Sequence, residues 1–390
     1  MRLGAKYDIA IIGAGAIAGV QGEAFVGFPE LCQVRAVCDL YIEKAQDLIK
    51  NKKLSMAKAY KTMEEAILSE DIDLVSICLP PSAHAKAAIQ AMEMGCHVLV
   101  EKPMANSLEE CDQMIAVSRR TGRRLSVVCQ NRFKTPMQRV HQMLQDKVGG
   151  KVLHAVVNSL WWRGENYYDL WWRGTWDSEC GGSFTSHSVH HIDLLLWMLG
   201  MPEAVTAVMK NVGHPNSELE DVGMAILEYP ETFAHIGTST VDHGEAQEIV
   251  FQTEKGRLNI PWLPAAEVSL PNGFPKHDEA RERELDAIYH SIPELELEGH
   301  GAQIKNLLLA IQGDEPLLTD GMEGRNTIEL IMAIYKSAAL RQTVTLPIQK
   351  EDAFYRKETM IRKMPHFFEK TKSVENFAPT EITLGRDVGK

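Results

Sequence analysis

The stretch IIGAGAIA, residues 11–18, follows a β-rich apolar run and opens a helical pattern. Gly13 and Gly15 stand where a backbone must turn tightly and approach a pyrophosphate closely. Ala16 and Ile17 then begin the helix, whose first amide groups point outward toward an anion. The stretch therefore predicts the phosphate-binding turn of a dinucleotide-binding Rossmann domain.

A carboxylate follows the second apolar run, QVRAVC, at Asp39. A carboxylate at the end of the second strand hydrogen-bonds the adenosine ribose and repels a 2′-phosphate. No arginine directly follows Asp39, so the sequence favours NAD over NADP. The alternative is a glycine turn in some other α/β sheet, with Asp39 as a surface charge.

The pattern of apolar residues differs between the first part of the chain and the rest. Up to about residue 130, short apolar runs alternate with helical patterns, which predicts a doubly wound parallel sheet. These runs are YDIAII, QVRAVC, DLVSICL, HVLV and RLSVVCQ. Longer alternating segments after residue 150, such as VLHAVVNSLWW and DVGMAILEY, predict an α+β domain with a large, mainly antiparallel open sheet. The predicted division is a Rossmann domain over 1–130, an α+β domain over 131–348 and a C-terminal extension over 349–390.

The composition excludes several classes of protein. The 390 residues carry a net charge of -12, which argues against the basic surface that nucleic-acid binding needs. No stretch approaches the roughly 20 apolar residues that span a bilayer, and the N-terminus lacks the plan of a secretory signal. Seven cysteines without a CxxC pair indicate reduced thiols in a cytoplasmic protein.

Two further stretches carry a resemblance to a known family. CLPPSAHAKAAIQAMEMGCHVLVEKPMANSLEEC, residues 78–111, and GG(x)7HHIDLLLWMLG, residues 181–200, are similar to the glucose-fructose oxidoreductase and inositol dehydrogenase (Gfo/Idh/MocA) family. The resemblance runs from about residue 7 to 348. It implies NAD(P)-dependent oxidation or reduction of a sugar, cyclitol or related secondary alcohol. It also implies association through the open sheet. An exposed sheet face and a C-terminal arm, whose PHFF and ENFAP stretches we expect to bury against another surface such as a second subunit, favour a homodimer or homotetramer.

On the cofactor side, the resemblance assigns roles to five residues. Lys102 of the EKP triplet matches the family's active-site lysine, suited to stabilising a developing alkoxide. Pro80 and His84 match the loop along the cofactor, and Glu101 lies near the nicotinamide ribose. Gln130 belongs to the segment that lines the site after the sixth strand. For Lys102 the alternative is a solvated surface lysine.

On the substrate side, TSHSVHHID, residues 185–193, holds three histidines. His190 matches the histidine of the family pattern D-x-G-x-H and suits proton transfer, because an imidazole titrates near neutral pH. Zinc binding by His187, His190 and His191 on one helix is the alternative, but the glutamate of the usual helical zinc motif is absent. We therefore predict no metal site, and merely packed histidines remain a third interpretation.

Ser186 stands where many relatives carry aspartate, one helical turn before His190. Without that carboxylate His190 loses a partner that would orient it and favour its charged form. We expect Asp177, Glu179, His187 or the substrate's own hydroxyls to supply part of that role.

Further residues are candidates for substrate contact. WWRGENYYDLWWRGTW, residues 161–176, holds five of the seven tryptophans, and aromatic faces stack on pyranose rings. Tyr168 and Trp176 are the candidates from this segment, with a core strand and subunit contact as the alternative. The remaining candidates are Arg132, Ser186, His187, His300 and Gln303. The last two match a family pattern that reaches toward the active site, and helix packing is their alternative.

The sequence leaves three functions open. The first is an NAD-dependent dehydrogenase of a sugar, glycoside or cyclitol, with His190 as acid/base and Lys102 polarising the oxygen. The second is a glycoside-cleaving enzyme that oxidises C3 transiently and then eliminates the aglycone. The third is a non-catalytic nucleotide sensor, against which the intact lysine and histidine argue.

Overall fold

The computed structural model describes residues 6–375 and 377 and divides into two compact units. The first comprises the chain up to Phe133 together with Leu297–Ile328. The second comprises Lys134–Glu296 and the chain from Glu329 onward. The first boundary lies near the predicted one at residue 130, but the sequence did not predict that residues 297–328 rejoin the first unit.

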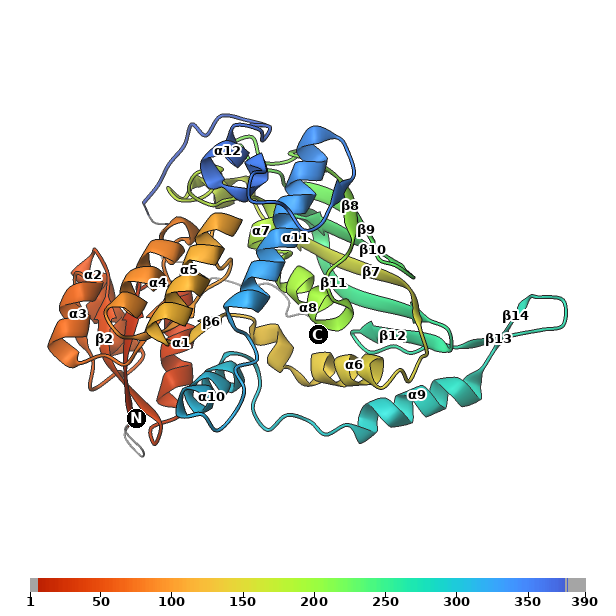
Figure 1. Ribbon diagram of the computed structural model, residues 1–390, viewed down its shortest axis with the longest axis horizontal. Coiled ribbons are helices and arrows are strands. Elements are labelled where there is room, and N and C mark those ends of the chain that lie inside the picture. Colours follow the sequence, from red (N-terminus) through yellow and green to blue (C-terminus); the bar gives the residue numbers. More distant parts are fainter. Residues whose placement is uncertain (1–5, 376, 378–390) are drawn as a thin grey trace. The chain divides into compact units, whose positions relative to one another are not determined.

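The first unit, drawn mostly in red and orange in Figure 1, is built on a six-stranded sheet in the order β3-β2-β1-β4-β5-β6, with all pairs parallel. The predicted doubly wound Rossmann sheet is therefore confirmed, in the strand order of dinucleotide-binding folds. Its strands are β1 (Tyr7–Ile12), β2 (Cys32–Cys38), β3 (Lys58–Tyr60), β4 (Leu74–Ile77), β5 (His97–Val100) and β6 (Leu125–Val127). Its helices are α1 (Ala16–Val26), α2 (Ile42–Asn51), α3 (Met63–Glu70), α4 (His84–Glu93), α5 (Leu108–Thr121) and α10 (Gly299–Gln312), with the short turns η1 (Pro81–Ala83) and η2 (Gln130–Phe133).

Local sequence signals set the boundaries of these helices. Thr62 and Ser107 are N-caps whose side chains accept hydrogen bonds from the amides of Glu65 and Glu110, as the spacing of a capping box requires. Gly122 ends α5 in the left-handed conformation that favours glycine. These caps depend only on residues close together in the sequence. The helix boundaries of this unit can therefore be predicted from the sequence.

Helix α10 packs in the first unit because it completes both its core and its hydrogen bonds. Leu307 and Leu308 are fully buried in the apolar cluster around β1 and β2. The Gln303 side chain donates to the Val127 carbonyl at 2.7 Å and accepts from the Cys129 amide at 3.0 Å. Gln303, for which a family pattern suggested substrate contact, thus satisfies buried backbone groups at the end of β6.

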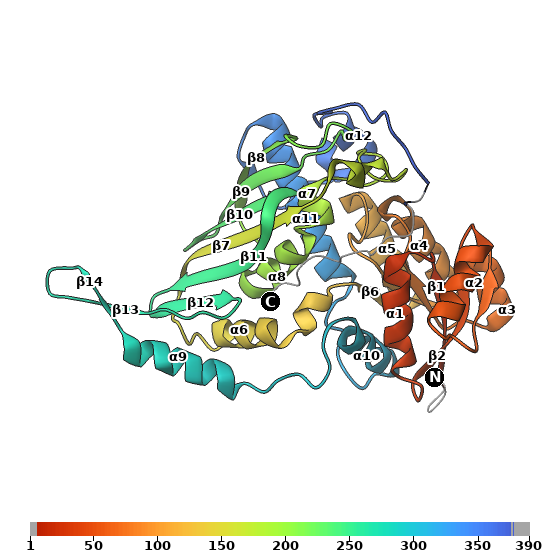
Figure 2. The ribbon, with the colours of Figure 1, turned by 180° about the vertical axis from the view of Figure 1, so that it is seen from behind.

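The second unit contains a seven-stranded sheet in the order β12-β11-β7-β10-β9-β8-β15, antiparallel except for β7 with β10. The predicted mainly antiparallel sheet is therefore confirmed. Its strands are β7 (Val152–Trp162), β8 (Ala204–Lys210), β9 (Val222–Glu228), β10 (Phe233–Ser239), β11 (Val241–Thr253), β12 (Gly256–Ile260) and β15 (Val344–Thr345), beside a hairpin of β13 (Glu267–Ser269) and β14 (Pro275–His277). Figure 2 shows these strands in front of α7 (Ser183–Ser186) and α8 (Val189–Leu199), which cover one face.

Helices and short turns complete this unit and the chain. They are α6 (Thr135–Gln145), η3 (Glu165–Asp169), α7 (Ser183–Ser186), α8 (Val189–Leu199), α9 (Glu279–Ser291), α11 (Gly321–Leu340), η4 (Ala353–Tyr355) and α12 (Lys357–Ile361). The division between the units falls within α11. Among the described residues, no helix combines the length and apolarity needed to cross a membrane.

The C-terminal extension returns to its own unit. Val374 forms a parallel bridge with Leu170, and its amide donates to the Asp169 carbonyl at 2.7 Å. The extension had suggested an arm that buries against another surface, and over residues 349–375 that surface belongs to the same chain. The last part of the ENFAP stretch lies outside the described residues.

All seven cysteines are buried thiols that form no disulfide within the described residues. Burial raises the pKa of the Cys32, Cys38 and Cys96 thiols to about 12. They behave as small apolar side chains rather than as nucleophiles or ligands.

Candidate active site

The glycine turn after β1 has the geometry of an anion cradle. Gly13 has φ +94°, and a Cβ at this position would lie 2.6 Å from the Cys78 carbonyl oxygen. Gly15 is the N-cap of α1 and gives no side-chain hydrogen bond to its first turn. The first amides of α1, beginning at Ala16 and Ile17, are therefore left for a ligand of opposite charge, such as a pyrophosphate.

Asp39 is fixed beside this turn, directly after β2. Its two carboxylate oxygens accept hydrogen bonds from the Ala14 amide at 2.9 Å and from the Tyr41 amide at 3.0 Å. The carboxylate thereby joins the glycine turn to the segment after β2. Its place supports the predicted contact with an adenosine ribose, and the residues present fit a dinucleotide.

Glu101 is buried and belongs to a polar network beneath the EKP triplet. Its carboxylate accepts from the Gln21 side chain at 2.5 Å and from the Lys102 amide at 3.3 Å. Gln21 in turn accepts a hydrogen bond from the buried Ser76 hydroxyl. Burial raises the pKa of Glu101, and the Lys102 ammonium opposes that rise. Glu101 therefore helps to fix the backbone at Lys102. The sequence did not predict that Gln21 supports Glu101, because a single glutamine in a helix carries no recognisable signal.

The His84 imidazole lies between two loops of the cofactor side. One ring nitrogen is 2.8 Å from the Pro103 carbonyl and the other is 2.8 Å from the Leu79 carbonyl. The side chain is almost fully buried, so it ties the loop after β4 to the loop after β5. Pro80, the neighbouring prediction, is partly exposed on the first of these loops.

The other candidates of the first unit differ in their surroundings. Arg132 is buried and forms an ion pair with Glu323 at 2.7 Å, which engages the guanidinium that was predicted to meet substrate. Gln130 and His300 are partly exposed. His300 lies in the first turn of α10, in the first unit, although its residue number suggested the second domain.

The histidine segment of the second unit is broken rather than continuous. Helix α7 ends at Ser186 and α8 begins at Val189, with His187 and Ser188 between them. Ser186 is therefore not one helical turn before His190, and its hydroxyl lies 2.8 Å from Nδ1 of His187 instead. The single helix face that would have presented three histidines to zinc does not form.

The three histidines differ in exposure. His187 retains 5% of its exposure and His191 none, whereas His190 is partly exposed on α8. Neither ring nitrogen of His191 has a hydrogen-bond partner among the described residues, and its ring packs edge-on against Trp161. Burial, helped by Lys134, lowers the pKa of His191 to about 3. His191 thus stays neutral and apolar in behaviour, which leaves His190 as the proton-transfer candidate of α8.

Replacing His191 by leucine is expected to stabilise the protein most at acidic pH. An unfolded histidine binds its proton near pH 6.5 and His191 only near 3, so wild-type stability falls by about 1.4 kcal/mol per pH unit below 6.5. Leucine removes that term, and urea unfolding at pH 5 and pH 8 measures it. His290→Gln, at an exposed site of α9, is the control. An equal change at both pH values would contradict the buried neutral imidazole.

A buried carboxylate anchors the backbone that carries this segment. Glu220 accepts hydrogen bonds from the amides of Gly182 and Phe184, each at 3.1 Å, and from the Tyr335 hydroxyl at 2.9 Å. A Cβ on Gly182 would lie 1.8 Å from the Glu220 carbonyl oxygen, so this position needs glycine. Burial raises the pKa of Glu220 to about 7. The paired glycines at 181–182 were the only local signal of this anchor.

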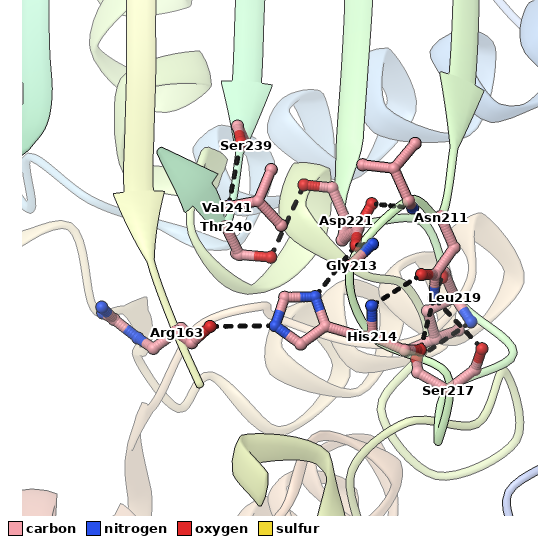
Figure 3. A network of polar contacts seen from close by, with 11 residues as sticks. Arg163, Asn211, Gly213, His214, Ser217, Leu219, Asp221, Ser239, Thr240 and Val241 are labelled. Atoms are coloured by element: carbon pink, nitrogen blue, oxygen red, sulfur yellow. Dashed lines mark hydrogen bonds and ion pairs between the residues drawn. The ribbon is translucent and has the colours of Figure 1, made fainter. Parts of the chain in front are cut away.

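The loop that carries Glu220 is held by a network of hydrogen bonds (Figure 3). The imidazole of His214 lies 2.9 Å from the Asp221 carboxylate and 3.0 Å from the Arg163 carbonyl. The Asn211 amide donates to three carbonyls of the same loop, including that of Leu219 at 2.8 Å. The loop 211–221 therefore presents Glu220 to α7 in one conformation.

Tyr168 and Trp176, the predicted aromatic contacts, are both fully buried. Trp176 donates its indole N–H to the Pro365 carbonyl at 3.0 Å and meets the Tyr335 ring edge-on. Tyr168 packs edge-on against His214. Neither side chain presents surface to a ligand in this structure, so the core role holds for these two residues.

The carboxylates expected to assist His190 are engaged elsewhere. Glu179 is buried, forms an ion pair with Arg173 at 2.5 Å and accepts from the Gly174 amide. Asp177 is exposed and pairs with Lys357 at 2.9 Å. The Arg173 guanidinium also lies 4.0 Å from the Tyr167 ring centroid, which completes a packed aromatic and ionic cluster.

Within the described residues, no group of three or more histidine, cysteine, aspartate or glutamate side chains is arranged to hold a metal ion.

Family models match both units. Residues 7–129 match the model described as an oxidoreductase family with an NAD-binding Rossmann fold. Residues 137–259 match the GFO/IDH/MocA C-terminal domain. The resemblance inferred from the EKP and histidine stretches is confirmed, and the first unit is an NAD-binding domain.

Individual relatives are distant. D-glucoside 3-dehydrogenase of Escherichia coli K12 is 27% identical over 194 residues, 50% of this chain and 54% of that protein. A 2,7-anhydro-N-acetylneuraminate hydratase of Mediterraneibacter gnavus is 26% identical, over 57% of this chain and 61% of that protein. The chain thus spans less than two thirds of either relative. The WlbA dehydrogenase of Bordetella pertussis, crystallised with NADH and UDP-GlcNAcA, superposes with a TM-score of 0.77 at 26% identity, over 88% of this chain and 99% of that one.

Proposed function

The chain belongs to the GFO/IDH/MocA family of NAD-binding oxidoreductases, and from that membership we propose that it oxidises a secondary alcohol of a sugar, glycoside or cyclitol. The glycine turn and Asp39 hold the dinucleotide, with Glu101, His84 and Pro80 shaping the loops beside it. NAD, when bound, supplies the acceptor for the two electrons of the alcohol carbon. The rest of the chemistry falls to side chains of this chain.

His190 and Lys102 have different roles at the substrate oxygen. Oxidation of a carbinol requires its hydroxyl proton to leave, and the His190 imidazole accepts that proton. The Lys102 ammonium stabilises the negative charge that develops on the same oxygen. The observation that carries this assignment is the exposure pattern of the histidine segment, in which His190 is partly exposed while its two neighbours are buried.

A second candidate function is glycoside cleavage by transient oxidation. A ketone at C3 acidifies the neighbouring C–H bond, so that the aglycone can be eliminated and the ketone reduced again. The hydratase among the relatives favours keeping this candidate, because hydration is not a net oxidation. A screen of sugars, glycosides and inositols for NADH absorbance, with and without a chelator, decides between the two. Accumulating NADH supports the dehydrogenase, and product without NADH supports the cleaving enzyme.

Replacing Asp39 by asparagine is expected to raise the Kd for NAD by about 10- to 100-fold. This factor corresponds to the binding free energy that a charge-assisted hydrogen bond to the ribose contributes. The same change is expected to reduce the preference for NAD over NADP, because asparagine carries no charge that would repel a 2′-phosphate. Calorimetric titration with both nucleotides measures the two effects. Asp47→Asn, on the exposed side of α2, is the matched control. An unchanged NAD affinity would remove Asp39 from the ribose site.

We also propose that the open face of the second sheet packs against a second copy of the chain. Val208, Met224, Ile226 and Phe233 are 48–63% exposed on β8, β9 and β10, where β8 to β10 lie side by side. Such an apolar face is typical of a homo-oligomer interface. Met224→Lys with Ile226→Lys is expected to convert a dimer or tetramer to monomer in sedimentation velocity. Leu68→Lys, at an exposed site of α3, is the control. A monomeric wild type would refute the interface.

A further inference from the structure

A chain of buried hydrogen bonds links α1 to the EKP triplet within the first unit. The Ser76 hydroxyl donates to the side-chain carbonyl of Gln21, and the side-chain amide of Gln21 donates to Glu101 at 2.5 Å. The other carboxylate oxygen of Glu101 accepts from the Lys102 backbone amide at 3.3 Å. Ser76 and Gln21 have no exposed surface and Glu101 retains 6% of its exposure, so each polar group depends on its neighbour in the chain.

The supply of protons fixes the direction of this chain. Ser76 has one hydroxyl proton, and its oxygen also lies 3.8 Å from the sulfur of Cys78. Burial raises the pKa of the Cys78 thiol well above its usual value, so the thiol keeps its proton and donates to the Ser76 oxygen. The serine proton is then given to the Gln21 carbonyl oxygen, which is a better acceptor than sulfur. This contact turns the amide N–H of Gln21 toward Glu101.

Both oxygens of the Glu101 carboxyl meet N–H donors. One donor is the Gln21 side chain and the other is the Lys102 backbone amide. Hydrogen bonds of this kind stabilise a carboxylate more than the neutral acid. Burial raises the pKa of Glu101, whereas the Lys102 ammonium and these two hydrogen bonds lower it. The direction of the Gln21 amide therefore favours the ionised form of a buried carboxyl.

The charge of Glu101 acts on Lys102 in return. Electrostatic coupling between two titrating groups is mutual, so the carboxylate whose pKa the ammonium lowers also holds the proton on that ammonium. In the proposed function the Lys102 ammonium stabilises the negative charge on the substrate oxygen, which requires it to stay protonated. A neutral Glu101 would withdraw this stabilisation from Lys102.

We infer that Gln21, oriented by Ser76, is a positioning residue that holds Glu101 as an anion and thereby keeps Lys102 charged in the reaction of the proposed function, on which this inference rests. An amide does not titrate, so its hydrogen bond to Glu101 is present over the whole working range of pH. Gln21 also lies in α1, which begins at Ala16. One helix thus carries both the amides predicted to meet the pyrophosphate and the side chain that sets the charge at the active-site lysine.

The charge of Glu101 is tested without turnover. At pH 8 exposed carboxyls are ionised, so the infrared C=O band of a protonated carboxyl reports only buried groups. The difference between wild type and Glu101→Gln is expected to show no such band. The difference between Gln21→Met and the double variant Gln21→Met/Glu101→Gln is expected to show one, because the anion has lost its donor. A band from Glu101 in the wild type, or none in Gln21→Met, would overturn the inference.

The effect on Lys102 is tested with the sugar that reduces NAD. In Gln21→Met the alkaline limb of kcat, which reports loss of the Lys102 proton, is expected to move about one pH unit lower, with KM for the sugar near the wild-type value. Ser76→Ala should cause a smaller shift and add nothing to Gln21→Met, because Ser76 acts only through the Gln21 amide. Gln90→Met is the matched control, since Gln90 of α4 also donates to a glutamate, Glu64, at an exposed site.

Two further variants at Gln21 separate charge from packing. Gln21→Glu has the same size, and its carboxyl shares one proton with Glu101, so the pair keeps one negative charge beside Lys102. The alkaline limb of Gln21→Glu should therefore stay in place. Gln21→Asn has an amide that is one carbon too short to reach Glu101, and it replaces Gln21→Met in both tests if that variant does not fold.

The outcomes distinguish this inference from the proposed function. NADH formation with an alkaline limb that Gln21→Met leaves in place would refute Gln21 as a positioning residue while leaving the dehydrogenase intact. An equal fall of kcat at every pH, with additive losses for Ser76→Ala, would assign Gln21 a packing role only. If no sugar, glycoside or cyclitol reduces NAD, the proposed function and the role of Lys102 both fail, and the infrared spectra still decide whether Gln21 holds Glu101 as an anion.

Discussion

His190→Gln is expected to lower kcat/KM for the sugar by about 10²- to 10⁴-fold, the usual contribution of a positioned acid or base. Glutamine occupies similar space and forms hydrogen bonds, but it cannot accept the hydroxyl proton. The loss should fall on kcat, because the proton moves in the chemical step rather than on binding. Steady-state kinetics with NADH absorbance across pH 5–10 measures it, and the acidic limb of the profile should disappear.

The NAD affinity of His190→Gln should equal that of the wild type, because the glycine turn and Asp39 belong to the other unit. His290→Gln controls for a change of histidine to glutamine as such. Activity that survives in His190→Gln and is abolished by a chelator would replace this assignment by metal chemistry.

The first unit could be predicted closely because its signals are local. The glycine turn at 13–15, the capping boxes at Thr62 and Ser107, and the apolar runs each specify a neighbouring turn, helix start or strand. Helix α10 was predicted to belong to the second domain, because the contacts that place it in the first unit are not local in the sequence. An apolar helix face does not say which sheet will bury it, and the amide of Gln303 that fixes its place contacts residues about 175 positions away.

The histidine segment shows a second limit of sequence reasoning. A continuous helix would put Ser186 and His190 on one face, and the spacing of four favours that interpretation. Helix α7 instead spans only Ser183–Ser186. Glu220 fixes its start through the Gly182 amide, a contact between residues 38 positions apart. Ser186 therefore turns to His187.

Aromatic residues could not be sorted by type alone. Tyr168 and Trp176 lie in a segment rich in tryptophan, and either a sugar platform or a core strand would use such residues. The C-terminal extension decides the matter, because the Pro365 carbonyl accepts the indole N–H of Trp176 and covers it. A segment of irregular sequence almost 190 positions away gave no hint of that contact.

Lys102→Met is expected to lower kcat by about 10²- to 10³-fold, comparable with the loss of one oxyanion donor. Methionine keeps most of the length of the side chain and removes the charge together with its N–H donors. Lys102→Arg should recover part of the activity, because a cation returns at a slightly different place. Lys86→Met, at an exposed site of α4, is the matched control in single-turnover and steady-state assays.

A loss of folding has to be separated from this loss of catalysis, because the Lys102 ammonium also opposes the raised pKa of buried Glu101. Without the ammonium, the pKa of Glu101 rises further above its unfolded value. The folded state then keeps its stability at low pH and loses it as the pH rises, since the unfolded carboxyl ionises first. Thermal unfolding of Lys102→Met should therefore match the wild type at pH 5 and fall below it at pH 8. A variant that melts like the wild type at both pH values and retains full kcat would exclude Lys102 from both roles.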